Sequence, residues 1–211
     1  MVKIGINGFG RIGRLILRAI LDNYKNKIQV VAVNDLGPIE TNAHLIKYDS
    51  THGIIDEEIQ TSKDGFTVGN QEIKVFAERD PTNIPWAKVG ADIVLECTGI
   101  YLDKSSAEKH IKAGAKKVII SAPGKEVDFT IVQGVNSKGL KKDHNIISNG
   151  SCTTNCLAPV AMVLEKTFGI TYGYMTTIHS YTGDQKLLDT LHKDLRRARS
   201  TEGAMIPTST G

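Results

Sequence analysis

The stretch Val2-Lys-Ile-Gly-Ile-Asn-Gly-Phe-Gly-Arg-Ile-Gly13 contains alternating apolar residues that run into a Gly-x-Gly-x-x-Gly motif. The alternation predicts a strand, and apolar residues spaced three or four positions apart from Ile12 to Ile20 predict a helix directly after the glycines. Placed between strand and helix, Gly8, Gly10 and Gly13 permit a tight turn, a close approach of backbone to a pyrophosphate, and close packing of helix on strand.

A second apolar strand, residues 28–33, ends in Asn34 and Asp35. An acidic residue at such a strand end, about 20 positions after the last glycine, accepts a ribose hydroxyl in dinucleotide-binding proteins. A lone glycine motif is often only a tight turn, but strand, glycines, helix, strand and acid in one unit predict a dinucleotide site. Because the Asp35 carboxylate repels a 2′-phosphate, NAD is favoured over NADP, with use of both as the alternative.

The rest of the first 150 residues predicts more strands. Residues 54–60 and 66–76 alternate, with turn signals at Asp64-Gly65 and Gly69-Asn70, and predict short antiparallel strands beside the main sheet. Buried-type strands at 92–96, 117–121, 129–132 and 145–148, with a helix at 103–113, then indicate a doubly wound parallel sheet. Ligands bind such sheets at the strand C-termini, where we place Gly8, Asp35, Gly99, Ser121 and Cys152.

Cys152 follows the last of these strands, within Gly150-Ser-Cys-Thr-Thr-Asn-Cys156, and the apolar run 157–168 predicts a helix behind it. A helix N-terminus favours thiolate over thiol, so Cys152 is a candidate nucleophile; the alternative is a small buried hydrophobe. A nucleophilic cysteine needs a base, and His179, at the end of an alternating segment (170–180) that predicts a strand, is the best of six histidines. A lone histidine at a strand end is more often a surface residue.

Composition limits the other classes of function. The chain has 211 residues, 40% hydrophobic, with net charge +3, three cysteines and no long apolar segment. These values predict a soluble, cytoplasmic protein without disulfides or membrane contact. The basic residues 186–199 are better explained as a solvated face or subunit contact than as a nucleic-acid site. Cys152 and Cys156 alone do not make a metal site.

Three motifs together resemble the glyceraldehyde-3-phosphate dehydrogenase family: Asn7-Gly-Phe-Gly-Arg-Ile-Gly-Arg14, Ser151-Cys-Thr-Thr-Asn-Cys156 and His179-Ser-Tyr-Thr-Gly-Asp-Gln185. The resemblance runs from Met1 to Gly211, and the cysteine motif is highly specific. It implies the phosphorylating reaction of glycolysis, in which Cys152 attacks the aldehyde, His179 activates the thiol, hydride passes to NAD, and inorganic phosphate releases 1,3-bisphosphoglycerate. It also implies a cytoplasmic homotetramer.

The resemblance assigns roles to further residues. It implies cofactor contacts at Arg11, Ile12, Asp35, Arg79 and Ser121. It implies contacts to the substrate phosphate or to inorganic phosphate at Ser151, Thr153, Thr182, Thr210 and Gly211. Taken by itself, Arg79 is a loop arginine of the kind that is more often simply solvated.

The sequence also departs from the family pattern. It stops at Gly211, before the family's remaining catalytic sheet, so we expect a Rossmann-type domain at 1–150, an incomplete α+β catalytic domain at 151–211, and little turnover from 1–211 alone. Residues 188–191 lack the Leu-Pro pair of many NAD-specific members, which leaves dual use of NADP open. The alternatives are an erythrose-4-phosphate dehydrogenase or a non-catalytic NAD-binding scaffold.

Overall fold

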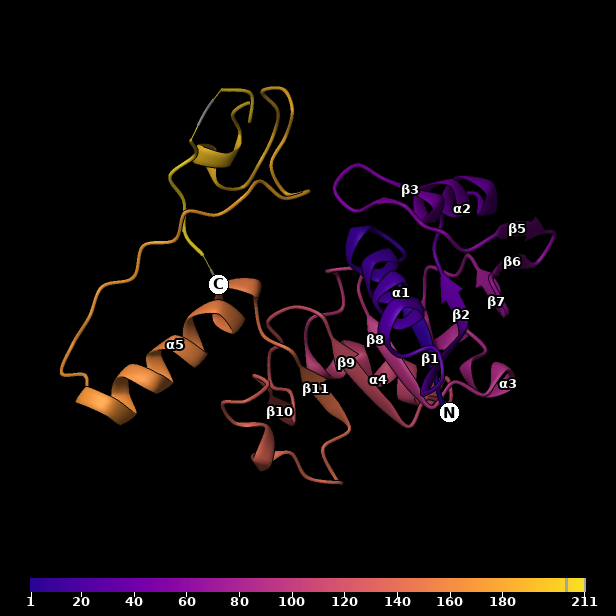
Figure 1. Cartoon of the computed structure of the whole chain (residues 1–211), viewed down its shortest axis with the longest axis horizontal. Coiled ribbons are helices and arrows are strands. Elements are labelled where there is room, and N and C mark those ends of the chain that lie inside the picture. Colours follow the sequence, from indigo (N-terminus) through magenta and orange to yellow (C-terminus); the bar gives the residue numbers. More distant parts are fainter. Residues whose placement is uncertain (204, 211) are drawn as a thin grey trace. The chain divides into compact units, whose positions relative to one another are not determined.

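The computed structural model describes residues 1–203 and 205–210, and the chain divides into two compact units, Met1–Cys152 and Thr153–Gly211. In Figure 1 the first unit runs from indigo to dark orange, and the second from orange to yellow. No helix of the described residues is long and apolar enough to cross a bilayer.

The first unit is built on one nine-stranded sheet, in the order β10-β11-β9-β8-β1-β2-β7-β6-β5. Its seven parallel strands are β1 (Val2–Asn7), β2 (Ile28–Asn34), β7 (Gln71–Phe76), β8 (Ile93–Glu96), β9 (Lys117–Ile120), β10 (Phe129–Thr130) and β11 (Ile146–Ser148). The antiparallel strands β5 (Ile59–Ser62) and β6 (Gly65–Val68) extend one edge, while β3 (Tyr48–Asp49) and β4 (Gly53–Ile54) form a separate hairpin.

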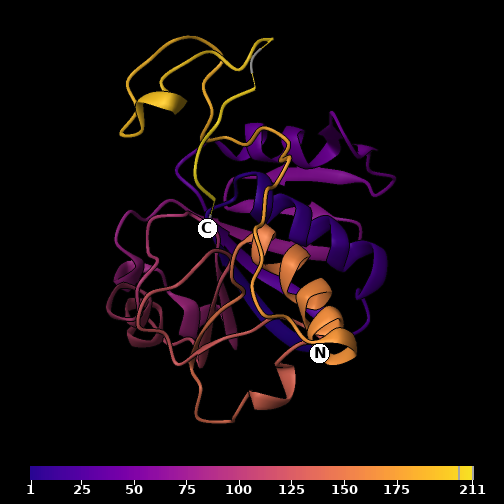
Figure 2. The same cartoon turned by 90° about the vertical axis from the view of Figure 1, so that its left-hand side faces the viewer.

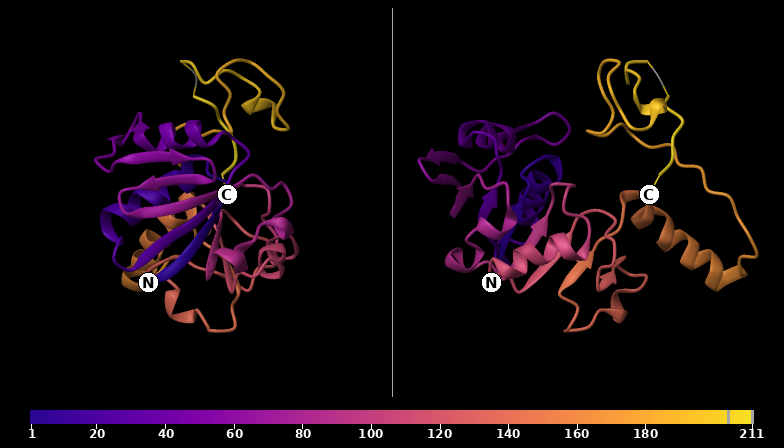
Figure 3. Two further views of the ribbon diagram at one scale, coloured as in Figure 1. Left: turned by 90° about the vertical axis from the view of Figure 1, so that its right-hand side faces the viewer. Right: turned by 180° about the vertical axis from the view of Figure 1, so that it is seen from behind.

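The helices lie on both faces of the sheet. On one face α1 (Arg11–Asn23) packs Leu17 and Ile20 against Ile4 and Ile6 of β1, and α2 (Ile39–Lys47) contributes to the same core. On the other face lie α3 (Trp86–Val89) and α4 (Lys104–Lys112), which Figure 3 shows from behind. Side chains of a strand alternate between faces, and this is why β2 places Val33 in one core and Ala32 in another.

The predicted α/β class, with a doubly wound parallel sheet, is confirmed. Residues 66–76 form two antiparallel strands, β6 and β7, which reverse at Gly69-Asn70 where the sequence predicts a turn, and β7 also pairs parallel with β2. The short strands therefore enlarge the main sheet at its edge.

The second unit consists of the rest of α5 (Cys152–Phe168) followed by irregular chain with one 3-10 turn at Leu195–Arg197 (Figure 2). The strand predicted at residues 170–180 is wrong: these residues have no strand structure. Alternation of apolar and polar residues favours a strand, but a strand also needs a neighbour for its backbone hydrogen bonds, and the described chain supplies none there.

Asp128 binds the backbone at the start of β11, and its substitution tests how much these contacts stabilise the fold. Its side chain is 16% exposed and accepts hydrogen bonds from Lys104 Nζ (2.6 Å) and from the backbone N–H groups of Asn145 and Ile146. Burial works to raise the pKa of Asp128, but the bonds from Lys104 and the two amides outweigh it and lower that pKa to about 2.

We predict that Asp128→Asn lowers the free energy of unfolding by about 1 kcal/mol at pH 7, because an amide replaces a charged acceptor. A carboxylate with a lowered pKa stabilises the fold above its ordinary pKa, and that contribution is lost as the pH falls toward 2. Urea unfolding should show the gap between variant and wild type narrowing below pH 4. The exposed Asp143→Asn is the matched control, and an equal loss there would contradict the assignment.

Candidate functional site

A cleft of about 380 Å³ lies in the first unit, where parallel strands end. Its lining is Asn7, Gly8, Gly10, Asn34, Asp35, Leu36, Glu78, Arg79, Cys97, Thr98, Ile100 and Tyr101. Four of the predicted cofactor residues are in this set. A second hollow, of about 420 Å³, lies beside β2, β7 and α3, but none of the predicted site residues lines it.

Gly8 sits at the floor of the cleft, in a conformation that excludes a side chain. Its φ is +85°, and a Cβ there would lie 2.7 Å from the backbone N of Thr98 and 2.8 Å from the carbonyl carbon of Cys97. Its own N–H donates to Asn34 O at 2.9 Å. The turn therefore brings bare backbone from three strand ends together, which is the surface that a pyrophosphate needs.

We predict that Gly8→Ala destabilises the protein by at least about 2 kcal/mol, because a left-handed φ and a backbone clash combine. Gly10→Ala is the matched control, since φ there is −70° and a Cβ would meet nothing within 4 Å. Urea unfolding of both variants measures the difference. Equal stability of the two variants would show that the backbone approach at Gly8 does not matter.

Asp35 joins the glycine turn to the end of β2. One carboxylate oxygen accepts from the backbone N–H of Phe9 and the other from that of Gly37, both at 2.9 Å. Each oxygen keeps a second lone pair that can accept a hydroxyl group from a ligand. The side chain is thus fixed at the rim of the cleft, with acceptor capacity left for a ribose.

The other predicted cofactor residues lie outside this lining. Arg11 begins α1 and forms an ion pair with Asp49 at 2.5 Å. Hydrogen bonds from the His52 amide, from Arg11 and from the Thr51 amide hold the pKa of Asp49 well below its usual range. Ile12 is 48% exposed, and Gly13 packs against Gly8 O. Gly99 is exposed, with φ of +72°. Ser121 follows β9, and its backbone N–H donates to Glu96 O.

Cys152 is the first residue of α5 and is exposed. The strand before it, β11, runs parallel to β9, β8 and β1, so Cys152 lies at the same edge of the sheet as Gly8. The turn between β11 and Cys152 is fixed by Ser148, whose hydroxyl donates to Ala122 O at 2.7 Å and accepts from the N–H groups of Gly124 and Gly150 at 3.0 Å each.

Cys97 is placed differently, although it lines the cleft. Burial raises the pKa of its thiol to about 11, against a smaller opposing effect of a hydrogen bond with Ser121. At neutral pH it is therefore a thiol and a poor nucleophile.

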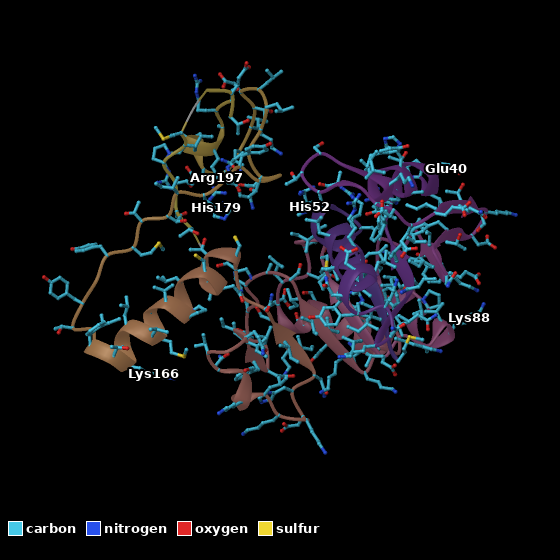
Figure 4. The ribbon with its side chains drawn as sticks, viewed as in Figure 1. Glu40, His52, Lys88, Lys166, His179 and Arg197 are labelled. Carbon is cyan, nitrogen blue, oxygen red and sulfur yellow. The ribbon has the colours of Figure 1, made fainter. Side chains whose placement is uncertain are left out.

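The second unit holds the predicted residues Thr153, His179, Thr182 and Thr210, and the structure brings two of them into contact. Thr153 is 6% exposed, and its hydroxyl lies 2.8 Å from that of Thr210. Arg197, labelled in Figure 4, pairs with Asp184 and donates to Thr208 Oγ1 and Ser209 O, next to Thr210.

His179 and Thr182 lie on the exposed chain after α5. Nδ1 of His179 is 2.6 Å from Ser180 O, and the Thr182 N–H donates to Gln185 Oε1. Ser151 is half-buried and belongs to the first unit, whereas the predicted residue Gly211 is outside the described residues.

Sequence reasoning missed several residues of the cleft. Asn34 and Thr98 could have been found from their positions at strand ends, beside Asp35 and Gly99. Glu78 and Tyr101 had no such signal, because their contacts join distant parts of the sequence. The Tyr101 hydroxyl donates to Arg79 O, 22 residues away, and Glu78 bonds to Asn34, 44 residues away.

The sheet, the glycine turn and the acidic residue at the end of β2 define a dinucleotide-binding α/β protein with a cysteine-bearing helix at the same sheet edge. The family model described as "Glyceraldehyde 3-phosphate dehydrogenase, NAD binding domain" matches residues 2–104, and that of the C-terminal domain of the same enzymes matches residues 151–211. The chain belongs to the glyceraldehyde-3-phosphate dehydrogenase family.

Curated relatives agree along the whole chain. It is 58% identical to glyceraldehyde-3-phosphate dehydrogenase of Geobacillus stearothermophilus over 211 residues and 56% identical to that of Xanthobacter flavus over 210. It is 55% identical to glyceraldehyde-3-phosphate dehydrogenase 1 of Bacillus cereus over 212 aligned positions. All of this chain is covered each time, but it spans only 62–63% of the length of these relatives.

Proposed function

We propose that the full-length gene product is a phosphorylating glyceraldehyde-3-phosphate dehydrogenase that uses NAD. The observation that carries the proposal is the placement of Cys152 on a helix N-terminus at the sheet edge that bears the glycine turn. Residues 1–150 form the NAD-binding domain and 151–211 begin the catalytic domain. The family models and relatives support this assignment.

The cleft suits a dinucleotide. The bare backbone around Gly8 leaves room for a pyrophosphate, and the Asp35 carboxylate faces the rim with spare acceptor capacity. Gly10, Arg11, Ile12, Gly13, Arg79, Gly99 and Ser121 complete the proposed contacts. NAD, when bound, supplies the acceptor for a hydride.

The residues of the chain carry out the covalent chemistry. The Cys152 thiolate attacks the aldehyde carbon while protonated His179 gives its proton to the carbonyl oxygen, which forms a thiohemiacetal. The hydride on that carbon would then leave to the bound dinucleotide, and His179 takes back the hydroxyl proton as the thioester forms. Inorganic phosphate then attacks the thioester carbonyl, the C–S bond breaks, and an acyl phosphate leaves while Cys152 returns as thiolate. Ser151, Thr153, Thr182, Thr210 and Gly211 supply hydroxyl and backbone donors for the two phosphate groups.

The reaction is tested by following NAD reduction with glyceraldehyde 3-phosphate, with and without phosphate or arsenate. We expect Cys152→Ser to lower kcat/KM at least about a thousandfold and His179→Asn by about a hundredfold. A full-length protein that binds NAD but oxidises no aldehyde would instead be a scaffold. Faster turnover of erythrose 4-phosphate than of glyceraldehyde 3-phosphate would make it the related erythrose-4-phosphate enzyme.

Cofactor choice is tested at Asp35. We expect Asp35→Gly to raise the kcat/KM ratio of NADP to NAD by at least about tenfold, because it removes the charge that repels a 2′-phosphate. Asp35→Asn keeps the shape and removes the charge, although its NH₂ group must face the backbone N–H of either Phe9 or Gly37. It should move the ratio in the same direction. Unchanged selectivity in both variants would mean that Asp35 does not set the preference.

The proposal extends to assembly and location. We propose a cytoplasmic homotetramer, on the strength of family membership. Sedimentation of the full-length protein at micromolar concentration measures the first part.

A further inference from the structure

A buried polar cluster lies directly beneath the cleft. Glu96 is 1% exposed, His110 0%, Asn7 2% and Asn34 4%. These residues come from β8, α4, β1 and β2, so the cluster joins the ends of three neighbouring strands to one helix. Burying an acid and a histidine is costly unless every polar atom is hydrogen-bonded. The side chains of the described residues meet that condition, since no buried side-chain N or O among them lacks a partner.

The hydrogen bonds define which ring nitrogen of His110 carries the proton. Nε1 of Trp86 lies 3.0 Å from Nδ1 of His110, and an indole N–H can only donate. Nδ1 must therefore accept, which leaves the proton on Nε2. Nε2 then donates to Oε2 of Glu96 at 2.9 Å.

The carboxylate of Glu96 accepts from every group around it. Oε2 accepts from His110 Nε2 and from Asn7 Nδ2 at 2.6 Å, while Oε1 accepts from the backbone N–H of Thr98 at 2.7 Å and from its hydroxyl. An ionised carboxylate is acceptor-only and can take all four bonds. No neutral side chain of this size can do so.

The charge on Glu96 also sets the orientation of two amides. Because Nδ2 of Asn7 points to Glu96, its Oδ1 points to Asn34 and accepts from Nδ2 there at 2.8 Å. Asn34 in turn donates to Glu78 O at 2.9 Å and accepts from the Glu78 N–H at 2.8 Å. The chain of hydrogen bonds thus reaches Glu78, which lines the cleft next to Arg79.

We propose that Glu96, held by His110 and Trp86, is a positioning residue for the dinucleotide. This inference rests on the proposed function, in which the cleft binds NAD. Asn7, Asn34, Glu78 and Thr98 all take a bond from this network, and all four line the cleft. An apolar core would hold the strands together at lower desolvation cost, so the directional bonds to the cleft are what the buried charge adds.

Glu96→Gln tests the proposal because no rotamer of the amide satisfies the site. If its NH₂ group takes the place of Oε2, it faces the His110 N–H; if it takes the place of Oε1, it faces the Thr98 backbone N–H, which cannot turn away. One donor faces another in either case. In the full-length protein we expect the Kd for NAD to rise about tenfold or more, the size of a buried unsatisfied hydrogen bond.

A control separates positioning from general loss of stability. Ile120→Val removes one methyl group from the core of the same sheet without touching the network. Both variants lower the free energy of unfolding, but only Glu96→Gln should weaken NAD binding. The rate of iodoacetamide labelling at Cys152, measured without NAD, should stay within about twofold of wild type in both, since Glu96 lies on β8 whereas Cys152 begins α5.

A second pair of variants decides the matter if Glu96→Gln does not fold. Thr98→Val keeps the shape but removes the hydroxyl that donates to Glu96, whereas Thr98→Ser keeps the hydroxyl. We expect weaker NAD binding in the valine variant than in the serine variant. Three results would overturn this inference and leave the proposed function standing. They are wild-type NAD affinity in Glu96→Gln, a loss of NAD affinity in Glu96→Gln no greater than in Ile120→Val, and equal NAD affinities in the two Thr98 variants. Failure of the wild-type protein to bind NAD would overturn the proposed function as well.

Discussion

Residue 8 has no room for a side chain, and the close packing of three strand ends in the first unit depends on this. The backbone of Cys97 and Thr98 passes so close to Gly8 that β1 and β8 end at one point, where the Cys97 N–H donates to Asn7 O at 2.7 Å. Asn34 O accepts from Gly8 on the other side. Three parallel strands thus finish together, and the cleft is the space that opens above their ends. The buried acid beneath that point supplies the directional bonds that the packing alone would not.

The sheet could be predicted from the sequence because the patterns that indicate its strands and helices lie within short stretches of the chain. The apolar strands, the helices between them and the glycines at 8, 10 and 13 are short-range patterns, and right-handed parallel crossovers leave few ways to connect them. Residues 170–180 show the limit of the method. Their alternation resembles that of a half-buried strand, but strand formation depends on a neighbour that a periodic pattern cannot provide.

The cleft was predictable only in part, for a similar reason. Gly8 and Asp35 are marked by spacing and by their place at strand ends, whereas His110 gave no signal, since it lies within an ordinary polar helix. Its importance comes from Trp86 and Glu96, which meet it only in the folded chain. Arg11 illustrates the opposite case: the resemblance implies a cofactor contact there, while the structure pairs its side chain with Asp49.

The buried side chains are unevenly distributed. Every buried hydrophobic residue of the described chain lies between Ile4 and Ile147, while on α5 Val160, Val163 and Phe168 are 55%, 57% and 80% exposed. A ribosome releases the N-terminal residues first, so the nucleotide-binding half can bury its core while later residues are still being synthesised. The residues of the second unit do not bury the apolar side chains of α5 in this way. Its apolar side chains, like those of Ile178 and Leu191 further along, remain in contact with water in the described chain.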